Sequence, residues 1–322
     1  MTICIKVYED VPETFYEADC ALRFPARDHA TGYYQNRTDR NIGWITPVEQ
    51  DILRQSVVGI AGTGGMGGLL AATLVRLGVG EIRIADTETF DVSNINRQFG
   101  ALRSTIGRSK ALETARLLRN ISDDVTLVVY PDGITENTAD SFLEGCSVVC
   151  DEIEFWAIGS RILLHQRARL QDISLFNCNS VGFATHLFLF RPDDCRIEDM
   201  FGLSYAESST LEHGIRNHTA TVEEIQYVME IMLRTLVPNL PEYCIDDSTY
   251  KTEPAVRARL LRENCASIIA TNPPFATGFL ANHILLHLVA ESVVHRKTII
   301  PPAPPGYLYL DAGLLEARIV HP

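Results

Sequence analysis

The stretch VVGIAGTGGMGG, residues 57–68, decides how this chain is expected to fold. Its first five residues favour a β-strand, a glycine-rich turn follows, and LLAATLVRLG then has the leucine spacing of a helix that stops at Gly78. Glycines suit such a turn because a phosphate reaches the helix N-terminus only where no Cβ blocks it. A glycine turn alone is also compatible with a turn that binds nothing. The glycines expected to hold a nucleotide are Gly62, Gly64, Gly65 and Gly67.

The next predicted strand, residues 81–85, ends in Asp86. An acid about 20 residues after the glycines, at a strand end, is placed to bind the ribose hydroxyls of a nucleotide. A simple strand-end cap is the other interpretation of this acid. Because Asp86 and the glycine turn occur together, we favour nucleotide binding.

The segment 91–110 is polar and is expected to be a loop that leads into a helix from Lys110. No other lysine lies between Lys6 and Lys251, so the position of Lys110 is unusual. Several cations directly after a ribose-binding strand have the composition of a polyphosphate-binding site. The polar residues of this segment are Asn94, Asn96, Arg97, Gln98, Arg103, Arg108 and Lys110.

Further strands are predicted at 125–130, in CSVVCDEIEFW (residues 146–156), and on both sides of Gly182. With helices between them, one of which has Thr135 as a possible cap, they predict an α/β fold with a Rossmann-like, doubly wound and largely parallel sheet.

Three acids, Asp151, Glu152 and Glu154, end the fourth predicted strand. The ends of parallel strands open onto the ligand crevice, so these acids are candidates for binding magnesium.

The C-terminal part is predicted to be irregular and helical and to cover the substrate. Residues 193–219 have the composition of a mobile loop over a site, and 221–236 form an amphipathic helix of the core or of a dimer surface. A helix at 275–294 carries His283 and His287 one turn apart. This spacing suits a metal site, but without the acid of an H-E-x-x-H motif we expect buried structural histidines. A final strand closes the chain.

The composition excludes several classes of protein. The 322 residues are 46% hydrophobic and carry a formal net charge of -13, which argues against nucleic acid or an anionic membrane as the main partner. The start, MTICIKVYED, and the lack of any run near ~20 apolar residues indicate a cytoplasmic protein. Eight scattered cysteines without a C-x-x-C pair indicate free thiols and no structural zinc site.

Ahead of the glycine turn, Arg37 and Arg40 are expected in a loop, followed by a short helix from Thr46 or Pro47. These motifs together resemble the ThiF/MoeB-type adenylyltransferases, whose fold is shared by ubiquitin-activating enzymes. The resemblance runs from about Arg37 to about Pro192 and more faintly to the end. The matching motifs are RTDRN for the family's R-Y-S-R-Q arm, GTGGMG for G-x-G-G-x-G, the strand IAD, SNINRQ for S-N-x-x-R-Q, GRSK for G-x-x-K and VVCDEIEFW for the D-x-x-D strand end.

The resemblance implies a role for each matching residue. It implies that Asp86 binds the ribose of ATP, that Asn94, Arg97 and Gln98 line the phosphates, and that Lys110 contacts them.

Two further residues have implied roles across the site. Arg40 would reach into the ATP site of the partner subunit of a homodimer, and Glu154 stands where the family has a magnesium-linked aspartate. The catalytic residues implied in this way are Arg97, Lys110, Glu154 and Arg40. The family's frequent catalytic cysteine has no clear counterpart; Cys195 is placed for it, but we favour a bystander thiol.

The resemblance therefore implies an ATP- and Mg²⁺-dependent adenylyltransferase that activates a carboxylate of a peptide or small protein. We expect an N-terminal arm at 1–48, an ATP-binding core at 49–192, and a substrate-covering part at 193–322. An NAD(P)- or FAD-binding oxidoreductase and a non-catalytic scaffold subunit are the alternatives. The sequence does not identify the carboxylate or its final acceptor.

Overall fold

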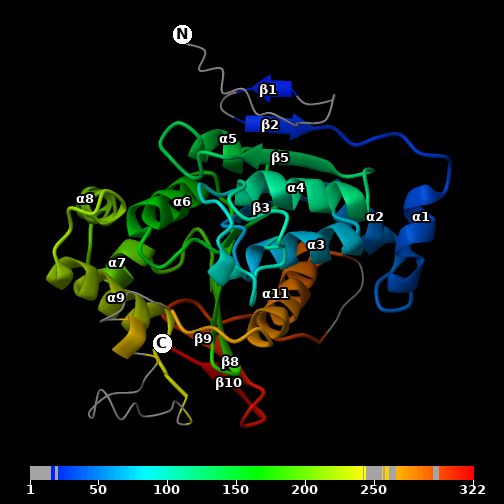
Figure 1. Ribbon diagram of the computed structural model, residues 1–322. Helices are drawn as coiled ribbons and strands as arrows, with labels where there is room; N and C mark the ends of the chain where they lie inside the picture. The colour runs from blue at the N-terminus through cyan, green and yellow to red at the C-terminus, as the bar shows by residue number, and fades with distance from the viewer. Residues whose placement is uncertain are drawn as a thin grey trace.

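A ten-stranded sheet runs through the centre of the computed structural model (Figure 1). The structure describes residues 16–18, 21–241, 243, 256, 258–260, 266–292 and 297–322. In spatial order the strands are β1 (Tyr16–Ala18), β2 (Ala21–Phe24), β5 (Thr126–Tyr130), β4 (Glu81–Ala85), β3 (Val57–Ala61), β6 (Val148–Asp151), β7 (Leu175–Val181), β8 (Ala184–Phe190), β9 (Tyr307–Asp311) and β10 (Glu316–Val320).

The five central strands are parallel, as the sequence predicts for a doubly wound fold. From β3 the chain continues to β4 and β5 on one side and then returns to β6 on the other side. This reversal is the topological switch point, and in open α/β sheets ligands bind at the carboxyl ends of the strands on either side of it. The glycine turn follows β3 and therefore lies at this point.

Antiparallel pairs extend the sheet at both edges. On one edge β2 pairs with β5 and β1 with β2, and on the other β8, β9 and β10 follow β7 in turn. The single final strand predicted for the chain is therefore a hairpin of β9 and β10.

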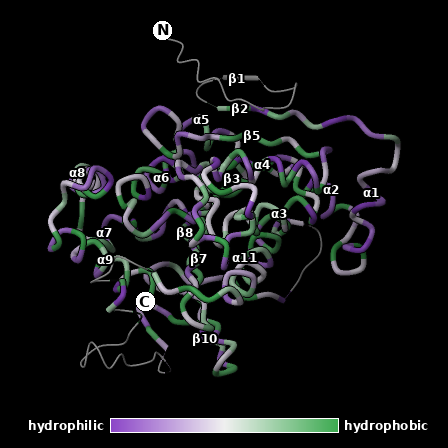
Figure 2. The backbone as a smooth tube through the Cα atoms, viewed as in Figure 1, coloured by the Kyte–Doolittle hydropathy of each residue, from purple (hydrophilic) through white to green (hydrophobic). Residues whose placement is uncertain are grey.

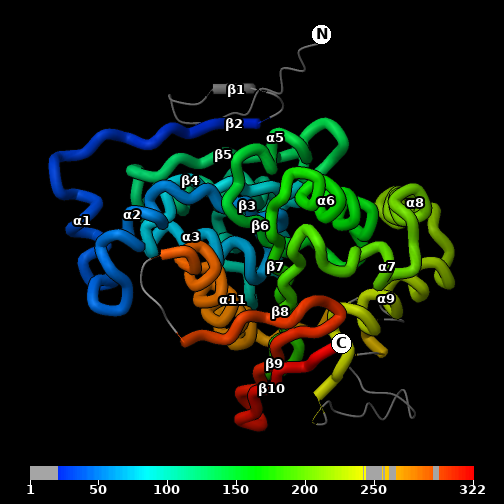
Figure 3. Tube along the Cα trace, turned by 180° about the vertical axis from the view of Figure 1, so that it is seen from behind, coloured from blue at the N-terminus to red at the C-terminus, as the bar shows by residue number. Residues whose placement is uncertain are grey.

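Helices cover both faces of the sheet, as the opposite views of Figures 1 and 3 show. One face packs against α3 (Gly67–Leu77), α4 (Lys110–Ile121) and α11 (Asn272–Leu288) in a core that includes Ile60 and Ile82. The other packs against α5 (Ala139–Leu143), α6 (Ile158–Leu170) and α9 (Val222–Leu236) in a core that includes Phe142 and Val149. Figure 2 shows the contrast between the mostly hydrophobic β5 and the largely hydrophilic α8 (Tyr205–Arg216).

Before the glycine turn, α2 (Pro47–Gln55) begins as predicted, because Thr46 and Glu49 form a capping box around Pro47. The prediction that Arg37 and Arg40 lie in a loop is wrong. Arg37 is in α1 (Tyr33–Thr38), where it pairs with Asp124, and Arg40 is in the 3-10 helix η1 (Asp39–Asn41).

The segment 193–219 is also not the predicted loop. It contains α7 (Ile197–Phe201) and α8, and a capping box of Ser204 and Glu207 starts the second helix. Ile197 and Phe201 are buried, which anchors the segment to the core.

Three smaller predictions can also be compared with the structure. The N-cap position of α5 is Thr138 and not Thr135, while η2 (Val92–Asn94) is a short helical turn within the polar loop. The division of the chain into three parts stays a prediction. Lys6, Lys251, Cys4, Cys20, Cys244 and Cys265 lie outside the described residues.

Candidate functional site

The glycine turn is packed so tightly at Gly62 and Gly67 that neither position has room for a side chain. Gly62 has a φ of 99°, and its N–H donates a 2.7 Å hydrogen bond to the carbonyl of Ala85. A Cβ at Gly62 would overlap the carbonyl oxygen of Glu152, and one at Gly67 would overlap the carbonyl oxygen of Gly62. The turn therefore presents backbone to the strand ends around it, which is the property that phosphate binding at a helix N-terminus requires.

Asp86 ties this turn to the end of β4. Its Oδ2 accepts hydrogen bonds from Thr63 N (2.7 Å) and Thr63 Oγ1 (2.9 Å), and its Oδ1 accepts one from Glu88 N (2.8 Å). Burial raises the pKa of Asp86, although the charge of Lys110 and these hydrogen bonds oppose that effect. The carboxylate is thus held in one orientation beside the turn.

Lys110 is the first residue of α4 and is buried, with 3% of its side chain exposed. Its Nζ lies 2.7 Å from Oε2 of Glu88, two residues after Asp86. The sequence did not single out Glu88, although its place at the end of β4 was a usable signal. The unusual lysine is therefore brought next to the strand end that carries Asp86.

The three residues of the SNINRQ motif that the resemblance assigns to the phosphates take different positions. Asn94 accepts a hydrogen bond from Asp91 N and so holds the η2 turn together. Arg97 is half-buried and donates to Ser93 O and to Asn96 Oδ1.

Gln98 and Glu154 meet at Gly64. A Cβ at Gly64 would lie 3.7 Å from Gln98 Nε2 and 3.8 Å from Glu154 Oε1. Gln98 is buried, and its Oε1 has no hydrogen-bond partner among the described residues. Burial, followed by the charge of Glu88, raises the pKa of Glu154 to about 7. The side of the turn that faces β6 therefore has one unpaired amide oxygen and one carboxyl group that ionises near neutral pH.

Asp151 is not available as a magnesium ligand, which corrects one of the three candidates. Its Oδ2 accepts from Arg161 Nε (2.7 Å) and lies 3.1 Å from Nε2 of His165, and its Oδ1 accepts from Ile153 N (3.1 Å). Burial opposes ionisation, but the charge of Arg161 and the His165 hydrogen bond lower the pKa of Asp151 to about 2. Asp151 is therefore part of a buried ion pair that anchors α6 to β6.

Of the other two acids, Glu152 has its Oε1 buried without a partner among the described residues, and burial raises its pKa well above the ordinary value. In the described part of the chain no group of three or more His, Cys, Asp or Glu side chains could hold a metal ion. The magnesium role of Glu154 stays a prediction.

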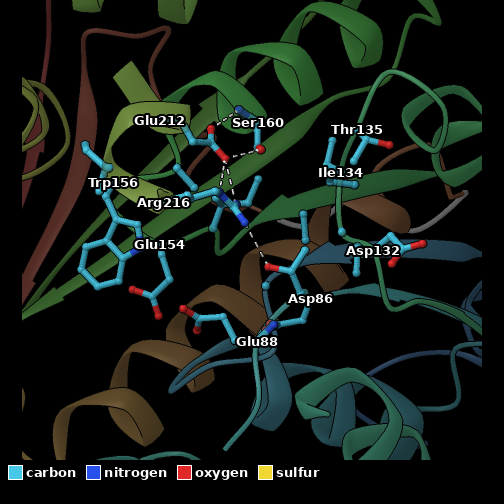
Figure 4. Close-up of a pocket in the computed structure, with 18 of the residues that line it drawn as sticks. Asp86, Glu88, Asp132, Ile134, Thr135, Glu154, Trp156, Ser160, Glu212 and Arg216 are labelled. Atoms are coloured by element: carbon cyan, nitrogen blue, oxygen red, sulfur yellow. Dashed lines mark hydrogen bonds and ion pairs between the residues drawn. The ribbon is translucent and has the colours of Figure 1, made fainter. Parts of the chain in front are cut away.

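A cavity of about 590 Å³ opens at the ends of β3, β4, β5 and β6 (Figure 4). Asp86 and Glu88 line it from β4, and Glu154 and Trp156 line it from the loop after β6. Its remaining wall comes from residues 212–225, the segment that sequence patterns left as a loop and the start of a helix. That segment contributes Glu212, Ile215, Arg216, His218, Ala220 and Ile225.

A second cavity of about 140 Å³ lies beyond Glu154, because Ile153 and Glu154 line both. Gly64, Gly65 and Pro273 form one side of it. Most of its other lining residues are apolar, with amides from β7 among them. They include Asn177, Asn179, Val181, Leu233, Val237, Leu240 and Ile268.

The remaining candidates lie outside the first cavity. Arg40 is exposed in η1 and is not among the residues that line the cavity, so its role across a dimer stays a prediction. His283 and His287 are partly buried and stack edge-on against Phe279 and Phe176, and burial lowers both pKa values.

Cys195 is an exposed free thiol, and slight burial and the charge of Asp199 raise its pKa. This is the opposite of what activates a cysteine nucleophile.

Within the described ranges no helix is both long and apolar enough to cross a membrane.

The sequence profile of the ThiF family matches residues 38–299. The tRNA threonylcarbamoyladenosine dehydratase of Bacillus subtilis (strain 168) is 32% identical over 135 residues, which are 42% of this chain and 52% of that protein. The protein of the same name from Escherichia coli (strain K12) is 36% identical over 124 residues, 38% of this chain and 46% of that protein. The chain thus matches about half the length of these relatives.

Solved structures resemble this one over most of its length. The crystal structure of PaaA has a TM-score of 0.59 at 14% identity, over 90% of this chain and 73% of that chain. The E. coli dehydratase TcdA in complex with AMP has a TM-score of 0.56 at 18% identity, over 82% and 98%. The microcin C7 biosynthetic enzyme MccB in complex with N-formylated MccA has a TM-score of 0.56 at 14% identity, over 90% and 73%. At these identities the likeness shows the fold alone.

Proposed function

Because the chain belongs to the ThiF family, we propose that it is an ATP- and Mg²⁺-dependent adenylyltransferase that activates a carboxylate of a peptide or small protein. The observation that carries the proposal is the junction of the two cavities at Glu154, beside a glycine turn that excludes side chains. Relatives with the same fold have been solved with AMP and ATP.

The larger cavity suits the adenosine of ATP. Asp86 is oriented by Thr63 and Glu88 at its floor, where an acid accepts hydrogen bonds from ribose hydroxyls. From there the phosphates would pass Gly62 toward Gly64 and Gly65, whose backbone approaches without a Cβ.

The phosphate end offers the polar groups that such a path needs. Lys110 is held at the start of α4, Gln98 is directed at Gly64, and Arg97 lies against Gly65, where a Cβ would be 3.7 Å from its Cγ. Arg97 and Lys110 would stabilise the charge that develops on the phosphate oxygens.

Magnesium fits the charges around Glu154. Burial and, after it, the charges of Glu88 and Asp86 raise the pKa of Glu154, and the three acids together create a negative potential at the phosphate path. Mg²⁺ usually takes one or two carboxylates together with substrate phosphates, and it supplies neutralisation of phosphate charge. Glu154 is the residue that we assign to it.

In this proposal the acyl group enters through the second cavity, on the other side of Glu154. A carboxylate oxygen entering from there forms a bond to the α-phosphorus, while the bond from that phosphorus to the bridging oxygen breaks and pyrophosphate leaves. The products are an acyl-adenylate and pyrophosphate, and no protein nucleophile is needed. The apolar walls of the cavity, with Leu233 and Val237, keep water away from the mixed anhydride.

A peptide is the favoured substrate, although the named relatives include tRNA-modifying dehydratases. The two dehydratases match 42% and 38% of this chain, and the net charge of -13 opposes binding of the tRNA backbone. MccB, whose fold matches 90% of this chain, was solved in complex with N-formylated MccA. A homodimer in which Arg40 completes the partner's site belongs to the same proposal.

The test is exchange of labelled pyrophosphate into ATP, with candidate peptides and, separately, tRNA. Exchange that depends on a peptide supports the proposal. Exchange with tRNA alone would indicate that the activated carboxylate belongs to a nucleoside of the tRNA and not to a peptide. Nucleotide binding without exchange for any carboxylate would support the alternative of a non-catalytic scaffold subunit. Stabilisation by NAD(P) or FAD but not by ATP would point to an oxidoreductase.

A further inference from the structure

The helix α8 is docked onto the start of α6 by a notch and a carboxylate. Gly159, in the first turn of α6, has no side chain, and a Cβ there would lie 2.7 Å from Cα of Ser209 in α8. Beside this notch, Glu212 of α8 accepts hydrogen bonds from Ser160 N (2.7 Å) and Ser160 Oγ (2.8 Å). A carboxylate at a helix N-terminus is stabilised by the unpaired N–H groups and the helix dipole. The position of α8 is therefore fixed relative to the strand ends.

The same carboxylate fixes Arg216. Oε1 of Glu212 accepts a 2.8 Å hydrogen bond from Nε of Arg216 one turn later, and Nη1 of Arg216 then lies 3.4 Å from Oγ1 of Thr87. Thr87 directly follows Asp86. Figure 4 shows the guanidinium pointing from α8 across the cavity toward this strand end.

The surroundings of Arg216 distinguish the two ends of the cavity. Asp86 and Asp132 both line this cavity, and the proposed function puts the uncharged ribose at Asp86. Gly64 and Gly65, in contrast, line the second cavity. Arg216 is therefore on the side of Asp86 and not on the side of the phosphate path.

We propose that Arg216 binds the adenosine half of the nucleotide and that Glu212 is its positioning residue, an assignment that rests on the proposed function. A guanidinium has five N–H donors in one plane. They can donate to ribose oxygens and purine ring nitrogens or stack on the base.

The experiment is calorimetric titration of AMP, ADP and ATP into wild-type protein and Arg216→Ala. If Arg216 contacts adenosine, its replacement should weaken the binding of all three nucleotides by the same factor. The expected factor is about tenfold for the loss of one hydrogen bond from a charged group. Arg196→Ala is the matched control, because Arg196 forms an exposed ion pair with Asp199 of α7 and is not among the lining residues. It should leave all three affinities unchanged.

Two results would overturn the assignment: unchanged AMP affinity in Arg216→Ala, or a loss that increases with the number of phosphates. If wild-type protein binds ATP and Arg216→Ala gives either result, this inference alone is wrong. If wild-type protein binds no adenine nucleotide, the proposed function is wrong as well.

Glu212→Gln tests the positioning role. The double variant with Arg216→Ala should bind AMP no more weakly than Arg216→Ala alone, because Glu212 acts through Arg216. Additive losses would show that Glu212 acts separately. Arg216→Lys keeps the charge but not the planar fork, and it should recover only part of the affinity. Full recovery would exclude the guanidinium-specific contact.

Discussion

Nζ of Lys110 lies 2.7 Å from Oε2 of Glu88, and the two side chains are 3% and 40% exposed. The lysine is therefore fixed, while its acidic partner can turn toward solvent. A phosphate oxygen can take the place of the Glu88 carboxylate without any movement of Lys110. The ammonium group is thus pre-organised for an anion, which is the condition under which electrostatic stabilisation of a transition state is largest.

Replacing Lys110 by Met should lower the rate of pyrophosphate exchange by about 10²–10³, the usual cost of removing one such group. Methionine keeps the apolar stem, so the far-ultraviolet circular dichroism spectrum should be unchanged. Lys297→Met changes an exposed lysine and is the control. An exchange rate for Lys110→Met within a factor of two of wild type would contradict the assignment.

Glu154→Gln should change how stability depends on pH. The folded pKa of Glu154 is raised to about 7, so the stability that its protonated form contributes is complete below the unfolded pKa of about 4.3 and is lost as pH rises through 7. Relative to the Gln variant, wild-type protein should become less stable between pH 5 and pH 8. Urea unfolding in EDTA without nucleotide measures this, and a stability difference that is independent of pH would contradict it.

Asp151→Asn should destabilise the fold by about 3–5 kcal/mol, because it leaves Arg161 buried without its charge partner. The folded pKa of Asp151 is about 2, so this contribution is present above the unfolded pKa of about 3.9 and is lost as pH falls through 2. Denaturant unfolding at pH 7 gives the cost. Asp199→Asn, which removes an exposed partner of Arg196, should have no measurable effect.

Gly159→Ala should separate α8 from α6, because the new Cβ would lie 2.7 Å and 2.9 Å from backbone atoms of Ser209. We expect a loss of about 1–3 kcal/mol in stability and a several-fold weaker affinity for ATP. Gly278→Ala is the matched control, since this helical position in α11 faces open space. It should raise stability by about 0.5–1 kcal/mol and leave ATP affinity unchanged. Equal effects of both variants on ATP binding would contradict the role of α8.

The parallel centre of the fold was predictable because its signals are local. A strand, a glycine turn and a helix follow one another within residues 57–77, and Asp86 ends the next strand, so neighbouring residues suffice to predict both. Strands β1 and β2 could not be predicted in the same way. β2 pairs with β5, which is about a hundred residues away, β1 pairs with β2, and residues 1–36 have no pattern of their own.

The site was predictable where one strand end carries several signals, and not where two distant segments meet. The position of Asp151 at the end of β6 predicts a metal ligand. Its actual partners, Arg161 and His165, reach it only when α6 folds back. Arg216 was missed because its segment is polar and was interpreted as a loop. The S-x-x-E of Ser204 and Glu207 was a helix-start signal that could have corrected this.

The wall that α8 adds to the larger cavity has a consequence for synthesis of the protein. Most of the cavity comes from residues 61–160, whereas the wall comes from residues 212–225. A nascent chain that ends before residue 205 lacks the wall, so a nucleotide would stabilise the first half of the protein less while the ribosome is still making the second. The full free energy of nucleotide binding would become available to the fold only after α8 has packed on Gly159. Two fragments separated near residue 192 should then reassemble more readily in the presence of ATP, with the nucleotide acting as a bridge between early and late parts of the chain.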